Sequence, residues 1–134
     1  MSTADLDAFR EAGRKTFPGL VGLEIVELEP RRAAGTLELG EQHLAPNGYL
    51  HAGTVVTLAD TVCGYGCIAS LPEGRTGFTT VELKANFLAS AREGALRCEG
   101  KLVHGGRSTQ VWDATVTDDA GRTLALFRCT QFLL

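Results

Sequence analysis

The feature that most constrains the fold is a long apolar segment, residues 52–72, whose single charged side chain is Asp60. Its apolar residues recur every three or four positions, which predicts a buried helix of about 18 residues, roughly 27 Å long. Such a helix is apolar on nearly every side, so the rest of the chain has to cover it almost completely. Gly64 and Gly66 lie inside it, and each costs about 1 kcal/mol relative to Ala. We expect the close approach of a neighbouring backbone to compensate.

The remaining segments predict one further helix and six strands. Alternating side chains and turn residues place a helix over 3–17, ended by Pro18-Gly19, and strands over 21–28, 33–39, 78–88, 95–103, 107–117 and 123–133. The strand 78–88 is expected to turn Val81, Leu83, Ala85 and Phe87 to one face and Thr80, Glu82, Lys84 and Asn86 to the other. Tight turns between successive strands make the sheet antiparallel. We therefore predict an α+β protein with one domain, residues 1–134, in which a curved sheet wraps around the central helix.

Composition excludes several classes of function. Hydrophobic residues make up 44% of the chain and charged residues 22%, the net charge is -3, and no run of Lys and Arg marks a nucleic-acid or membrane surface. The chain has neither a signal-peptide pattern nor an apolar stretch of about 20 residues, so we expect a cytoplasmic protein that crosses no membrane. The cysteines, which we expect to be reduced, lack the second ligand pair of a zinc site, so no metal is predicted; they are Cys63, Cys67, Cys98 and Cys129.

Asp60 is the candidate reactive group, because a carboxylate in an apolar helix is costly to desolvate unless it has partners or reaches a cleft. It either lies on a narrow solvent-facing stripe, caps a neighbouring element, or acts as a general base or nucleophile at a cleft. Gly53 lies seven residues earlier, on the same helical face and about 10 Å away along the axis. Its backbone N–H is either free to hold an oxyanion at the helix N-terminus, or the glycine serves only close packing.

The three histidines and two short motifs complete the candidates. His51 immediately precedes the helix and either contacts a substrate or only bonds the loop backbone, and we favour the structural role. His43 and His104 are interpreted as surface or turn residues. Residues 64–69 match G-x-G-x-x-A but fall inside the helix, which excludes dinucleotide binding. No G-x-S-x-G elbow indicates a serine hydrolase.

Residues 47–53, NGYLHAG, followed by 58–61, LADT, resemble the G-x-x-H-G-G-x-x-x-x-L-[AV]-[DE] signature of hotdog-fold acyl-CoA thioesterases. The likeness is closest to the PaaI-like branch of the 4-hydroxybenzoyl-CoA thioesterase superfamily and covers most of residues 20–134. It implies a hotdog fold, and hydrolysis of acyl-CoA thioesters to free acid and coenzyme A. No cofactor is implied, because coenzyme A is part of the substrate. The resemblance also implies a homodimer with each site at the dimer interface, and the tetramer of such dimers that is common in the family.

The resemblance assigns a role to each matching position. Asp60 matches the acid that attacks the thioester or activates water, Gly53 the N–H that polarises the carbonyl, and His51 the histidine near the acyl group. Thr80 matches a hydroxyl that, in some members, holds the attacking water from the other subunit. The positions at which members often contact coenzyme A are Gly106, Arg107, Ser108 and, nearby on a strand, Lys84.

Three positions depart from the pattern. The middle glycine of the signature is Ala52, the Asn or Gln usually found six residues before the histidine is Ala45, and a Ser or Thr found four residues after the acid is Gly64. Asn47 is the candidate replacement for the missing amide, and Thr80 for the missing hydroxyl. Two alternatives stay open: a non-catalytic acyl-CoA-binding protein, and a hotdog enoyl-thioester hydratase or dehydratase, which pairs a histidine with a carboxylate.

Overall fold

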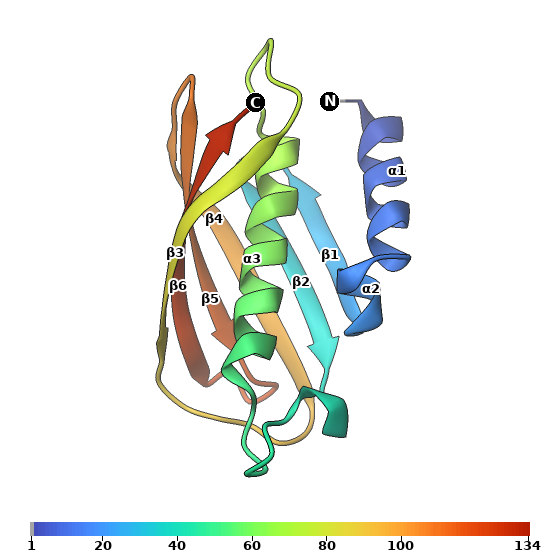
Figure 1. The fold of residues 1–134 in the computed structure, drawn as a ribbon, viewed down its shortest axis with the longest axis vertical. Helices are drawn as coiled ribbons and strands as arrows, with labels where there is room; N and C mark the ends of the chain where they lie inside the picture. The colour runs from blue at the N-terminus through green and yellow to red at the C-terminus, as the bar shows by residue number, and fades with distance from the viewer. Residues whose placement is uncertain (1) are drawn as a thin grey trace.

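The computed structural model describes residues 2–134 and contains one long helix packed against a single sheet (Figure 1). Its elements in chain order are α1 (Thr3–Arg14), α2 (Phe17–Leu20), β1 (Leu23–Glu29), β2 (Arg32–Glu38), the 3-10 turn η1 (Glu41–His43), α3 (Ala52–Ala69), β3 (Phe78–Phe87), β4 (Ala95–Gly105), β5 (Thr109–Thr117) and β6 (Thr123–Leu133). The predicted α+β order is confirmed, with the short elements α2 and η1 added to it.

The six strands form one antiparallel sheet in the order β1-β2-β4-β5-β6-β3. The chain leaves β2 near one side, runs along α3, and returns as β3 at the opposite edge, so α3 lies across one face of the sheet (Figure 1). The strands curve around this helix, while α1 lies beside it on the side of β1. This arrangement leaves β1 and β3 as the two edge strands.

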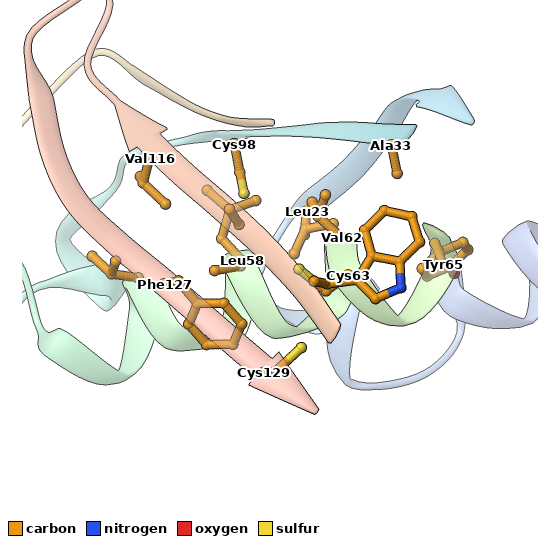
Figure 2. Packing of buried hydrophobic residues seen from close by; sticks show 14 of the residues in the cluster. Leu23, Ala33, Leu58, Val62, Cys63, Tyr65, Cys98, Val116, Phe127 and Cys129 are labelled. Carbon is orange, nitrogen blue, oxygen red and sulfur yellow. The ribbon is translucent and has the colours of Figure 1, made fainter. Parts of the chain in front are cut away.

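The core lies between α3 and the sheet. Leu58, Val62 and Cys63 of α3 point toward strand residues such as Val116 and Phe127 (Figure 2). α3 has the length and mean hydropathy, 1.3 over 18 residues, of a membrane span, but 56% of it is buried inside the fold, as expected of a core helix. The four cysteines are free and buried, and burial raises the pKa of Cys67 to about 12, so these thiols pack as apolar groups.

Aromatic rings, and not a backbone, explain the two glycines inside α3. A Cβ at Gly66 would lie 2.5 Å from Cη2 of Trp112, and a Cβ at Gly64 would lie 2.9 Å from Cζ of Phe78. The expectation of a neighbouring backbone is therefore wrong. Glycine, which has a low helix propensity, occupies these two positions because two large rings from β5 and β3 pack directly on the helix surface.

Three predicted boundaries are also wrong: the end of α1, the end of β4 and the start of β5. α1 ends at Arg14, and Pro18-Gly19 lies within α2, where a proline in the first turn is tolerated because no N–H donor is needed there. β4 continues through His104 to Gly105, so the predicted turn shifts toward 106–108 and β5 begins at Thr109 instead of Arg107. The turn closes through the Gly106 N–H, which donates to the Thr109 carbonyl at 2.9 Å.

A β-bulge at Val81 changes the direction of the side chains in β3. The register with β6 skips Val81, so Thr80 pairs with Gln131 and Leu83 pairs with Cys129. Gln131 and Cys129 are both buried on the α3 side of the sheet, so Thr80 shares that side with Leu83. The prediction placed Thr80 on the opposite face, because strict alternation has no place for the extra residue of a bulge.

His43 lies in the turn η1, one of the two positions predicted for it, but it is buried and not at the surface. Its Nδ1 accepts a hydrogen bond from the Gly40 N–H at 2.9 Å, so its Nε2 carries the proton and donates to the Val21 carbonyl at 2.6 Å. The Thr54 hydroxyl donates to the His43 carbonyl at 2.9 Å. His43 therefore ties the loop before α3 to the segment before β1, and fixes where α3 begins.

The close fit of Gly66 against Trp112 predicts that Gly66→Ala destabilises the protein. Ala gains about 1 kcal/mol of helix propensity, but overpacking a filled core costs about 1–3 kcal/mol, and the Trp112 ring is fully buried and has no room to move. Urea unfolding should show a lower midpoint. Gly77→Ala is the matched control, because a Cβ there meets no atom within 4 Å. A midpoint that stays level or rises for Gly66→Ala would contradict the packing described.

Candidate active site

A groove of about 380 Å³ runs between α1 and the outward face of α3. The residues that line it from α1 and the segment after it are Phe9, Ala12, Gly13, Thr16 and Pro18, and those from α3 and β3 are Asp60, Thr61, Gly64, Tyr65 and Phe78. On α3 these positions follow helical spacing, which places the only charged residue of the helix on a face that the sheet does not cover. The lining is apolar except for the carboxylate and a few hydroxyl groups.

Asp60 is partly buried in the wall of this groove. Its Oδ1 is buried and has no hydrogen-bond partner among residues 2–134. Burial raises the pKa of Asp60 above that of an ordinary aspartate, because desolvation disfavours the charged form. Within the part of the chain described, Oδ1 therefore caps no neighbouring element. A carboxylate with an unused oxygen and a raised pKa has the properties of a general base or nucleophile.

The N-terminus of α3 is capped by His51. The His51 Nδ1 accepts a hydrogen bond from the Gly53 N–H at 2.7 Å. A Cβ at Gly53 would lie 2.8 Å from the same nitrogen, so the glycine makes room for the imidazole. The N–H expected to polarise a carbonyl thus has an acceptor in this structure.

Asn47 closes its own turn. Its Oδ1 accepts a hydrogen bond from the Tyr49 N–H at 3.2 Å, and the Gly48 N–H donates to the Ala45 carbonyl at 2.8 Å. The side-chain oxygen of Asn47 is therefore engaged, while its NH₂ group remains a hydrogen-bond donor. Ala45 offers only a methyl group at the position where an amide was expected.

Thr80 and Lys84 do not line the groove. The Thr80 hydroxyl donates to Oε1 of Gln131 at 2.7 Å. Lys84 pairs with Arg128 across β3 and β6, on the face of the sheet turned away from α3 and hence away from Asp60. The structure does not bring Lys84 and Asp60 of one chain together.

The β4–β5 turn, which carries Gly106, Arg107 and Ser108, lies at the other end of the molecule from the start of α3 (Figure 1). Arg75 holds this turn: its Nε donates to the Arg107 carbonyl at 2.9 Å and its guanidinium to Oγ of Ser108 at 3.4 Å. The Arg107 side chain itself is exposed. Within one chain, the turn and Gly53 are thus at opposite ends of α3.

Sequence reasoning identified Asp60 and the start of α3 but missed three groups. Thr61 is next to Asp60 on α3, so the helical pattern of the sequence is sufficient to place it near the same face. Ala12 and Thr16 line the groove only because α1 packs beside α3, which no local pattern indicates. As for metals, no group of three His, Cys, Asp or Glu side chains that could hold an ion occurs within residues 2–134.

Comparison with known proteins places this geometry in a family. Residues 47–125 match the thioesterase superfamily. The 1,4-dihydroxy-2-naphthoyl-CoA hydrolase of Listeria monocytogenes is 37% identical over 110 residues, which cover 82% of this chain and 89% of that protein. The protein of the same name from Escherichia coli is 30% identical over 132 residues, covering 96% of this chain and 94% of its own.

The fold has a close counterpart among solved structures. The crystal structure of a mutant thioesterase from Pseudomonas aeruginosa superimposes with a TM-score of 0.90 over 99% of this chain and 96% of that chain. Its sequence identity of 23% supports a likeness of fold alone. Together with the sequence match, this likeness confirms the predicted resemblance: the chain belongs to the thioesterase superfamily and has its hotdog fold.

Proposed function

We propose that this thioesterase hydrolyses acyl-CoA thioesters to the free acid and coenzyme A, with Asp60 as the general base or nucleophile. The observation that carries the proposal is the buried, unpartnered Oδ1 of Asp60 in the wall of an apolar groove. The names of the two relatives, both acyl-CoA hydrolases, support the substrate class. The N-terminus of α3 would receive the thioester oxygen.

In the general-base route, the Asp60 carboxylate takes a proton from water while the water oxygen attacks the thioester carbon. The C–S bond then breaks, and the sulfur of coenzyme A leaves with a proton. In the nucleophilic route, the carboxylate attacks the thioester carbon, the C–S bond breaks and coenzyme A leaves as the thiolate. Water then hydrolyses the resulting anhydride, which releases the free acid and restores the Asp60 carboxylate. A raised pKa suits both routes, because the more basic carboxylate is both the stronger base and the stronger nucleophile.

The oxyanion would be held at the start of α3. The thioester oxygen would replace the His51 Nδ1 as acceptor of the Gly53 N–H, so one hydrogen bond is exchanged for another. The displaced His51 lies beside the acyl group. The NH₂ of Asn47 is the second donor we propose, in place of the amide that Ala45 lacks.

The site is proposed to be completed in a homodimer formed along β3. Val81, Leu83 and Phe87 on this edge strand are 56%, 42% and 50% exposed, and the outer backbone edge of β3 pairs with no strand within residues 2–134. A second copy paired antiparallel along β3 would satisfy that edge and cover the apolar side chains. It would also carry its own Thr80, Arg107 and Ser108 toward the groove of the first subunit, where the coenzyme would bind. Tetramer formation and a cytoplasmic location stay predictions.

Asp60→Asn is expected to lower thioester hydrolysis by at least about a hundredfold, the contribution of a positioned general base. Release of free thiol from a panel of short, medium and aromatic acyl-CoAs measures it, with Asp7→Asn on the exposed side of α1 as the matched control. Near-normal turnover of the best substrate by Asp60→Asn would refute the mechanism. Thermal stabilisation by acyl-CoA with no thiol release by the wild type would favour the non-catalytic binding protein, consistent with Ala45.

Asp60→Asn is also expected to be more stable than the wild type at neutral pH. Because burial raises the pKa of Asp60, the folded protein holds its proton more tightly than the unfolded chain. The wild type therefore loses stability as the pH rises from the ordinary aspartate pKa through the raised folded value, whereas Asn has no charge to lose. Urea unfolding at several pH values should show the gap between the variant and the wild type widening over that interval. A gap independent of pH would contradict the raised pKa.

Leu83→Arg is expected to convert a dimeric protein into monomers, because it places a charge on the apolar side of the proposed β3–β3 contact. Sedimentation velocity measures the change. Leu20→Arg is the control, since Leu20 is 80% exposed on α2, away from β3. A dimer that survives Leu83→Arg, or a wild type that sediments as a monomer, would exclude the proposed interface.

A further inference from the structure

The far wall of the groove belongs to α1, which gives the N-terminal helix a place in the site. Opposite Asp60 and Thr61, the groove is lined by Phe9, Ala12 and Thr16. Ala12 is the smallest of these three side chains, and it is exposed in the single chain. The width of the groove at this point therefore depends on the size of one α1 side chain.

This wall is held in a fixed position. The Arg10 guanidinium donates to the Ile25 carbonyl at 2.7 Å, which ties α1 to β1. The Phe9 and Tyr65 rings pack edge to face with centroids 4.7 Å apart, and the Tyr65 hydroxyl donates to the Phe9 carbonyl at 3.4 Å. A Cβ at Gly13 would overlap that hydroxyl, so the two helices approach as closely as glycine permits.

The side of the groove opposite α1 is formed by α3 and the Phe78 ring. Gly64 presents bare backbone to the groove, and the Phe78 ring packs where a side chain at Gly64 would lie. The space is therefore bounded by aromatic rings and backbone, with the Asp60 carboxylate at its polar side. An apolar group bound against these rings would be removed from water, which favours its binding.

We propose that α1 forms the wall of the acyl site and that Ala12 is the residue that limits the size of the acyl group. The site then accepts apolar acyl groups bulkier than acetyl, which extend from the thioester at Asp60 toward α1. This proposal rests on the proposed function for the location of the thioester, and it adds a specificity-determining residue on an element that contributes none of the residues assigned to the reaction.

The test is the ratio of kcat/KM for octanoyl-CoA or benzoyl-CoA to kcat/KM for acetyl-CoA. Ala12→Phe should lower this ratio at least about tenfold, the size of effect produced when a substrate no longer fits an apolar pocket. Ala12→Leu, with a smaller side chain and good helix propensity, should lower it less. Ala4→Phe is the matched control, because it makes the same change on α1 at a residue that does not line the groove, and it should leave the ratio as in the wild type.

Binding measurements keep this inference separate from the proposed function. In an Asp60→Asn background, the Kd of each acyl-CoA can be measured by calorimetry without turnover. Tighter binding of octanoyl-CoA or benzoyl-CoA than of acetyl-CoA, with the difference lost on adding Ala12→Phe, supports the acyl wall even if the wild type hydrolyses nothing. A ratio and a Kd difference unchanged by both Ala12 variants, with the proteins folded by circular dichroism, would overturn it whatever happens at Asp60.

Discussion

The structure depends on the burial of α3 with one carboxylate on it. The sheet covers the apolar side of this helix, and residues such as Leu58 and Val62 are fully buried against it. Asp60 can exist in such a helix only where the covering is incomplete, because a fully enclosed and unpaired carboxylate would be too costly. The gap between α1 and α3 provides that place, and it leaves Oδ1 out of water yet without a partner. The same incomplete covering thus accounts for both the groove and the unpartnered oxygen of its acid.

Glycines and aromatic rings determine the shape of this gap. Gly66 receives Trp112, Gly64 receives Phe78, and Gly13 receives the Tyr65 hydroxyl. The first contact closes the core beneath α3, whereas the other two bring a ring and a second helix close to Asp60. Contacts between a glycine and an aromatic side chain therefore both stabilise the core and form the walls of the groove. In the proposed site, changes at Gly13 and Gly64 should affect stability and the substrate range together, whereas a change at Gly66 should affect stability alone.

Periodicity in the sequence was sufficient to predict most of the elements and the candidate acid. Asp60 could be identified because it is the only charged residue in an apolar helix, and this property can be seen in the sequence of that helix alone. The direction of Thr80 was mispredicted because a bulge at Val81 arises from pairing with β6. The burial of His43 depends on an acceptor 22 residues away in the sequence, the Val21 carbonyl. Ala12 is a surface residue by pattern, and only the tertiary placement of α1 gives it a part in the groove.

The capping of Gly53 by His51 stabilises the start of α3. The N–H has an acceptor in this structure, so the helix end needs no ligand to be stable. In the proposed mechanism, a thioester oxygen would take the place of Nδ1 and restore the hydrogen bond in the bound state. The same exchange would move His51, and would thereby connect binding at the helix terminus with the surroundings of the acyl group.

In the proposed mechanism, the Asp60 carboxylate performs the reaction with a pKa raised by burial. Carbon NMR can titrate the Asp60 carboxyl, and its pKa can be compared with the acidic limb of kcat/KM. We expect the two midpoints to coincide and both to lie above the pKa of an ordinary aspartate. A normal pKa at Asp60, or an acidic limb that persists unchanged in Asp60→Asn, would contradict this mechanism.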